Sequence, residues 1–188
     1  REVPAIDCSY TTFDWSRFTE NPYSFKELVL GMKQAKFDIK DQMTNHGCKY
    51  NERDLQWWLD QPPALRVNLK PTPNDLTPSQ FMEKLIDYLR SSNKIDRWWS
   101  RSNSFDPVIL ERLAQYANKT SLMNDYLKFW AVRDTRTFID AKFDFPKLNG
   151  FVPVSDTAKW EYNFKAHDSK HDVAADILRL QAITRAEN

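Results

Sequence analysis

The sequence predicts an α/β fold, because a segment with the alternation of a β-strand comes early and segments with helical periodicity follow. Residues 5–13 alternate loosely between apolar and polar side chains, as a half-buried strand does. Residues 77–80 are Thr-Pro-Ser-Gln, a capping box with proline at the first helical position. At 188 residues the chain is expected to form one domain with a sizeable core.

Two strands and two helices are expected in the first half of the chain. The strands are predicted at residues 5–13 and 24–30, the second ending at a glycine. Asn51 is predicted to cap a helix that a double proline terminates, with an apolar stripe formed by Leu55, Trp58 and Leu59. The capping box at 77–80 begins the next helix, which is expected to bury Phe81, Leu85, Ile86 and Leu89.

The second half is expected to begin with a short strand at residues 97–100. A helix should follow from Asp106, and further short elements are predicted at 126–131 and 134–141. A last helix places Val173, Ile177, Leu180 and Ile183 or Thr184 on one face. Strands followed by interleaved helices support the α/β class and no more detailed topology.

Composition narrows the class of protein. The net charge is +1, so no global positive field indicates a scaffold that coats DNA. The two cysteines lack zinc-like spacing, and no apolar run is long enough for a membrane span. A cytoplasmic protein is expected, in the host cytoplasm if the source is viral.

The segment most informative about function is Ala-His-Asp-Ser-Lys-His-Asp, residues 166–172, directly before the last helix. His167 precedes the helix and Asp172 lies in its first turn, so both side chains can point at the same spot. Histidine can take a proton from water near neutral pH, and a carboxylate can hold a divalent metal. Taken alone, however, His167 is more typical of a loop, and Asp172 of an acidic residue favoured by the helix dipole.

A second carboxylate, Asp106, stands before a proline at a predicted helix start. Without context this pattern favours a structural N-cap, although one oxygen can cap while the other faces a metal. Asp176 lies one turn beyond Asp172 on nearly the same face. We interpret Asp176 as a supporting or surface residue rather than a ligand.

Three segments occur together in one order along the chain: Ser104-Phe105-Asp106, then Lys128-Phe129-Trp130 with Arg133-Asp134-Thr135-Arg136-Thr137, and then 166–172. In these segments the sequence resembles the DEDDh class of 3'→5' exonucleases, and in particular exonuclease A of T-even bacteriophages. The resemblance covers nearly the whole chain. It implies an RNase H-like fold, with a mixed sheet flanked by helices.

The resemblance also implies site residues and a reaction. Asp106 and Asp172 would be metal ligands and His167 the general base, with Asn103, Phe105 and Arg101 as candidate substrate contacts. The expected cofactors are two divalent ions, Mg²⁺ or Mn²⁺. The expected activity releases mononucleotides from single-stranded DNA, because exonuclease A acts on DNA. Related families trim RNA, so RNA stays an alternative; no membrane partner is expected, and a homodimer is left open.

One motif of the DEDDh class is absent. The class begins with a strand carrying Asp-x-Glu, two further metal ligands, and this sequence contains no matching strand. We therefore expect that the chain is a portion of a longer protein whose first strand supplies both residues, and that the portion alone has little activity. The alternative is a catalytically silent nucleic-acid-binding module that lost this motif.

Overall fold

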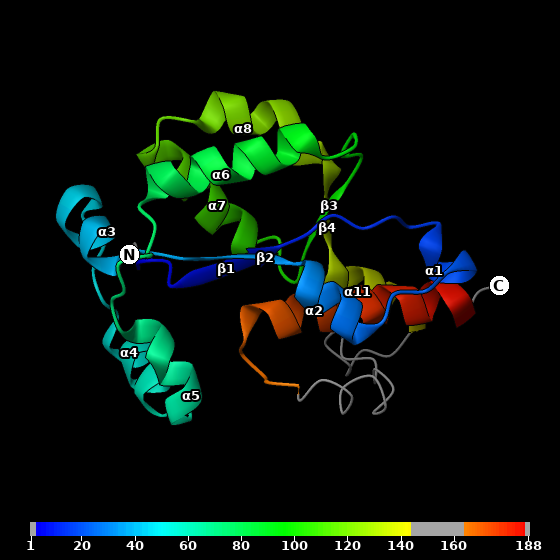
Figure 1. The fold of residues 1–188 in the computed structure, drawn as a ribbon, viewed down its shortest axis with the longest axis horizontal. Helices are drawn as coiled ribbons and strands as arrows, with labels where there is room; N and C mark the ends of the chain where they lie inside the picture. The colour runs from blue at the N-terminus through cyan, green and yellow to red at the C-terminus, as the bar shows by residue number, and fades with distance from the viewer. Residues whose placement is uncertain (1–2, 144–163, 187–188) are drawn as a thin grey trace. The chain divides into compact units, whose positions relative to one another are not determined.

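The computed structural model describes residues 3–143 and 164–186, and the chain forms two compact units (Figure 1). Each unit combines segments that are distant in the sequence. Unit 1 contains Arg1–Cys8, Gln34–Asn93 and Ile109–Tyr126, and unit 2 contains Ser9–Lys33, Lys94–Val108 and Leu127–Asn188. All candidate site residues belong to unit 2.

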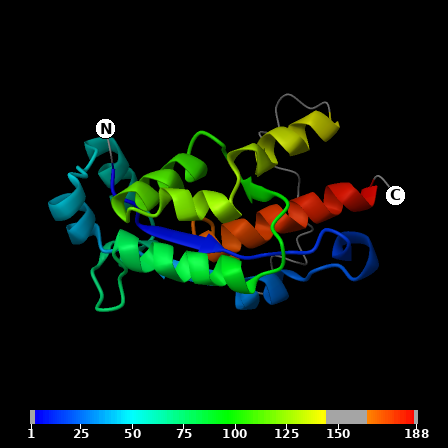
Figure 2. The same cartoon turned by 90° about the horizontal axis from the view of Figure 1, so that it is seen from above.

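Unit 2 is built on the C-terminal helix α11 (Ser169–Ala186). Helices α1 (Arg17–Glu20), α2 (Phe25–Gly31) and α9 (Thr135–Phe143) pack against it (Figures 1 and 2). Alanines on α11 allow α2 to approach closely, and the shared core consists of Phe18, Phe25, Leu28, Val29, Met32, Ala174, Ala175, Ile177, Leu178 and Leu180. The prediction of a last helix with a buried apolar face is therefore confirmed.

The strand predicted at residues 24–30 is wrong, because this segment forms helix α2. The Ser24 side chain accepts a hydrogen bond from the backbone N–H of Glu27 and so caps the helix. Phe25, Leu28 and Val29 follow the i, i+3, i+4 spacing of a helix face, and all three are buried. The apolar run at 28–30 suggested a strand, but the cap and the packing against α11 decide for a helix.

The structure contains two two-stranded sheets among the described residues. Strand β1 (Asp7–Tyr10) pairs with β2 (Lys33–Lys36), and β3 (Trp98–Ser100) pairs in parallel with β4 (Val132–Asp134). The strands predicted at 5–13 and 97–100 are confirmed with shorter limits. The α/β class is confirmed as well, whereas the RNase H-like mixed sheet stays a prediction.

Unit 1 is mainly helical. Its elements are α3 (Ile39–His46), α4 (Glu52–Leu59), α5 (Pro63–Arg66), the 3-10 turn η1 (Val67–Leu69), α6 (Pro78–Ser91), most of α7 (Asp106–Tyr116) and α8 (Thr120–Tyr126). The capping box of α6 forms as predicted, with Thr77 and Gln80 each bonding the other's backbone, and its four predicted core residues are buried. Helix α6 packs against α8.

Helix α4 begins as predicted, with the Asn51 side chain accepting the backbone N–H of Arg53 at 3.0 Å. Its predicted apolar stripe, however, is not buried, and Leu59 remains 47% exposed. Local capping is sufficient to start a helix, but burial of its apolar face requires a partner element. No helix within the described ranges is both long and apolar enough to cross a membrane.

Candidate active site

The start of helix α11 is held in place by local hydrogen bonds. Asp168 caps the helix: its Oδ1 accepts the backbone N–H of Lys170 at 3.1 Å, and its carbonyl accepts that of Asp172 at 2.9 Å. The hydroxyl groups of Ser169 and Ser9 are 2.7 Å apart, which ties the helix start to the end of β1. The first turn of α11, and with it Asp172, is therefore well fixed.

His167 lies in a tight turn immediately before this cap. The backbone N–H of Asp168 donates to the carbonyl of Lys165 at 3.3 Å, and His167 has a φ of 65°. A positive φ at the third residue of such a turn is the type II geometry that usually requires glycine or asparagine. A histidine there costs on the order of 1 kcal/mol, and strain of this kind is concentrated at functional sites.

The second histidine of the run, His171, has a different environment. It is buried, its Nδ1 accepts the backbone N–H of Lys165 at 3.0 Å, and its ring contacts the Phe25 ring edge-on at 5.4 Å between centroids. Burial lowers the pKa of His171, and the charges of Lys165 and Lys170 lower it further against the opposing effect of Asp168. His171 is therefore a structural residue, whereas the exposed His167 is open to solvent.

Asp172 carries the largest electrostatic perturbation in the site. Burial raises the pKa of its carboxyl from 3.8 to about 6. The nearby charge of His167 and a hydrogen bond from the His167 backbone act in the opposite direction, and the charges of Asp176 and Asp168 raise the pKa further. Asp172 and His167 are therefore direct neighbours, as the five-residue spacing predicts.

Asp106 is the first residue of α7, where the segment after β3 turns into the helix. Desolvation by surrounding protein atoms raises the pKa of this carboxyl, although part of the side chain is open to water. A hydrogen bond from the Arg101 backbone lowers the pKa, and the charges of Asp176 and Asp134 raise it. Asp106 and Asp172 thus come from distant segments, and both lie within the field of Asp176.

Asp176 is held by two guanidinium groups. Its Oδ1 pairs with Arg101, and it lies 2.5 Å from the Nη1 of Arg179. The side chain of Arg179 is only 9% exposed and that of Asp176 15%. Arg101 was expected as a substrate contact. In the structure its guanidinium forms an ion pair with Asp176, and its backbone N–H donates a hydrogen bond to Asp106.

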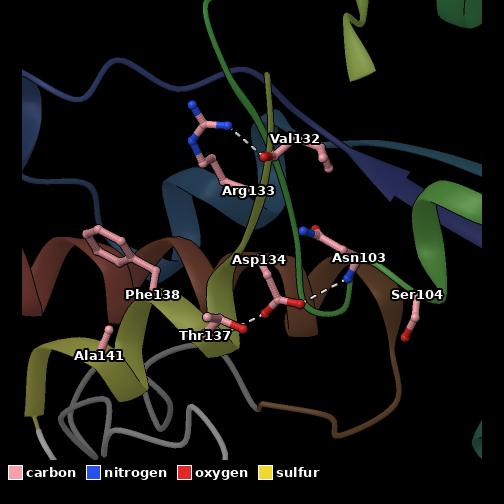
Figure 3. A pocket seen from close by; sticks show the side chains of 8 residues that line it. All are labelled: Asn103, Ser104, Val132, Arg133, Asp134, Thr137, Phe138 and Ala141. Atoms are coloured by element: carbon pink, nitrogen blue, oxygen red, sulfur yellow. Dashed lines mark hydrogen bonds between the residues drawn. The ribbon is translucent and has the colours of Figure 1, made fainter. Parts of the chain in front are cut away.

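Asn103 and Phe105 lie in the loop between β3 and α7. The Asn103 backbone N–H donates to Asp134 Oδ2 at 3.0 Å, and Asp134 Oδ1 accepts the N–H of Thr137 at 2.9 Å (Figure 3). This loop borders a pocket of about 580 Å³ whose other walls are β4 and the α9 residues Thr137, Phe138 and Ala141. Phe105 is 62% exposed.

The donor chemistry around Asp176 suits a hard cation. Carboxylate oxygens are the ligands that Mg²⁺ and Mn²⁺ prefer. Burial is the main cause of the raised pKa values of Asp106 and Asp172, and the charge of Asp176 raises both further. Within the ranges that the structure describes, however, no three His, Cys, Asp or Glu side chains are close enough to share an ion. The described residues therefore provide the type of ligand that a divalent metal prefers, but too few of them to complete a coordination sphere.

Comparison with known proteins defines the class as 3'-5' exonucleases, enzymes that hydrolyse phosphodiester bonds. The chain belongs to the family of the 3'-5' exoribonuclease Rv2179c-like domain, whose model matches residues 29–183. The exodeoxyribonuclease of Enterobacteria phage T4 is 31% identical over 207 aligned residues, which cover 98% of this chain and 83% of the relative. No solved structure gives a significant match. The resemblance to phage exonucleases is confirmed.

Three residues have contacts in this site that the sequence did not specify. Asp176, interpreted as a supporting or surface residue, pairs with Arg101 and Arg179, and its charge acts on both candidate ligands. Asp134 and Arg179 were given no specific place in the site, although the first fixes the loop before α7 and the second pairs with Asp176. The available signal was the position of Asp176 one turn beyond Asp172, which places both on one helix face.

Proposed function

We propose that this chain acts as one exonuclease domain that removes mononucleotides from the 3' end of single-stranded DNA in a metal-dependent reaction. The observation that carries the proposal is the arrangement of Asp172, with its raised pKa, beside the exposed His167 and in the field of Asp176. We propose DNA rather than RNA as the substrate because the phage relative, matched over 98% of this chain, is named an exodeoxyribonuclease.

In the proposed reaction a water molecule attacks the phosphorus of the last phosphodiester bond, the P–O3' bond breaks, and the leaving 3'-oxygen takes a proton from solvent. His167, whose charge and backbone both act on Asp172, takes the proton of the attacking water. Asp106 and Asp172 would supply two of the metal ligands. A divalent ion held by these carboxylates would stabilise the negative charge that develops during hydrolysis.

In this scheme Arg101 positions the two carboxylates Asp106 and Asp176 and takes no part in the reaction itself. Its backbone N–H orients the Asp106 carboxylate, and its guanidinium neutralises Asp176. A second ion would need carboxylates beyond Asp106 and Asp172, and the sequence contains no Asp-x-Glu strand.

The test compares two proteins on 5'-labelled oligonucleotides of one sequence, made as DNA and as RNA. One protein is the 188-residue chain, and the other is the same chain preceded by a strand bearing Asp-x-Glu. We expect the extended protein to shorten DNA from the 3' end with Mg²⁺ or Mn²⁺, and Asp106→Ala or Asp172→Ala to abolish the reaction.

Three results would each contradict a part of the proposal. Metal-dependent hydrolysis that survives Asp172→Ala would place the active site elsewhere. If the protein binds the oligonucleotide but does not hydrolyse it with either Mg²⁺ or Mn²⁺, the result would favour the catalytically silent binding module. Faster hydrolysis of RNA than of DNA would leave the assignment of the active site unchanged and make RNA the preferred substrate.

A further inference from the structure

Two aromatic side chains face solvent beside the pocket, on the 3-10 turn η2 (Phe129–Ala131). Phe129 is 77% exposed and Trp130 64%, and their rings meet edge to face at 5.0 Å between centroids. The turn is held in place because the Trp98 Nε1–H donates to the carbonyl of Lys128 at 3.0 Å. Large aromatic groups presented to water on a fixed turn are typical of a surface that binds something flat and apolar.

Two cationic side chains, Lys128 and Arg133, contact this turn. Lys128 Nζ lies 5.9 Å from the Trp130 ring centroid, and Arg133 Nη1 donates to the carbonyl of Trp130 at 2.9 Å. The same Nη1 also donates to the carbonyl of Val132 at 2.7 Å (Figure 3). Residues 128–142 contain four basic and two acidic side chains, a net charge of +2 against +1 for the whole chain. Aromatic faces next to cations complement the bases and phosphates of a single nucleic-acid strand.

The β3/β4 pair sets the direction from this turn to the candidate active site. Trp98 is paired with Val132 and Ser100 with Asp134, so η2 lies at the beginning of the pair and the loop to Asp106 lies at its end. Three residues of strand separate the two ends by about 7 Å. The pocket runs along β4, because Val132, Arg133 and Asp134 all line it.

We propose that Phe129 and Trp130 form a stacking platform for a base of the single-stranded substrate upstream of its 3'-terminal nucleotide, with Lys128 facing a phosphate of the strand. This inference rests on the proposed function for the choice of ligand and for the position of the 3' end. The platform would hold the strand while its terminus occupies the site at Asp106 and Asp172.

The test measures binding in EDTA, so that affinity is separated from hydrolysis. Fluorescence anisotropy with labelled oligothymidylates of two to eight nucleotides gives Kd for the 188-residue chain and for Phe129→Ala/Trp130→Ala. We expect affinity to rise with length in the unchanged protein, and the double variant to lose about 5- to 150-fold on the longest strand and little on the dinucleotide.

Three further variants sharpen the test. Trp130→Phe keeps an aromatic face and should retain most of the affinity. Trp57→Ala is the matched control, because Trp57 is also exposed, at 43%, and also meets a neighbouring tryptophan edge to face; its Kd should not change. Lys128→Gln should reduce the slope of log Kd against log salt by about 0.7, the value for one phosphate contact on a single strand.

A double variant with unchanged Kd at every length would overturn the platform, as would an equal loss in Trp57→Ala. Conversion of a dimer to a monomer with unchanged Kd would assign the aromatic turn to a second copy of the chain and also overturn it. Failure of the proposed function would look different from failure of the platform. In that case Asp172→Ala would leave hydrolysis intact, while replacement of Trp130 would still weaken binding.

Discussion

Replacing Asp172 by asparagine tests the electrostatics of the site most directly. The carboxyl has a pKa of about 6 because burial disfavours its charged form. Asparagine keeps nearly the same shape and an oxygen that can accept the hydrogen bond from the His167 backbone, and it carries no charge. The variant should therefore be more stable than the unchanged protein in the absence of metal at pH 8.

The size of the effect follows from the pKa. The pKa is raised from 3.8 to about 6, and each pKa unit corresponds to about 1.4 kcal/mol, so full expression of the shift would give about 3 kcal/mol. Asp172 is only partly buried, and solvent screening reduces the effect to about 1–2 kcal/mol.

The pH dependence has a definite sign. Since the folded-state pKa is above the ordinary value, the folded protein binds this proton more tightly than the unfolded chain does. The stability that Asp172 contributes is present at low pH and is lost as the pH rises through about 6. The difference in free energy of unfolding between Asp172→Asn and the unchanged protein should therefore fall at pH 4.5 to about a third of its value at pH 8.

Urea denaturation in EDTA at pH 8 and pH 4.5 measures these differences. Asp87→Asn is the control, because that side chain is 74% exposed and its replacement should change the free energy of unfolding by at most about 0.5 kcal/mol. Adding Mg²⁺ at pH 8 should stabilise the protein with Asp172 more than the variant. An Asp172→Asn protein no more stable than its parent at pH 8 would refute the reasoning.

Three other changes have expected outcomes. His167→Ala should lower kcat by about 10²–10⁴-fold and leave the metal-free Kd for oligonucleotide nearly unchanged, as measured by single-turnover kinetics and anisotropy. Asp176→Asn should cost about 2–4 kcal/mol in urea denaturation, because it leaves the buried Arg179 without its counter-charge, and it should move the pKa of the Asp172 carboxyl below about 6 in an NMR titration. Gln181→Leu should cost about 2–4 kcal/mol, because the Gln181 amide bonds both the N–H and the carbonyl of Tyr23, and thermal unfolding would show the loss.

Helix starts were the most predictable part of the fold. The Thr77 capping box, the Asn51 cap and the start of α7 at Asp106 all form as expected, since caps depend on neighbours a few residues away. The segment at 24–30 was predicted incorrectly because a short apolar run fits a buried strand as well as a buried helix. Packing against α11 resolved it, and that contact spans about 150 residues of sequence.

For the candidate site, sequence alone determined the residue types and the neighbourhood of His167 and Asp172, because their separation along one helix start fixes their proximity. The tertiary structure decided everything that depends on segments meeting in space. It brought Asp106 into the field of Asp176, directed the Arg101 guanidinium to that aspartate, and buried His171 while leaving His167 exposed. It also exposed Trp130, while it placed the ring of Trp99 in β3 against the ring of Phe138 in α9. Burial and electric field are sums over neighbours from the whole unit, so no local pattern of residues can specify them.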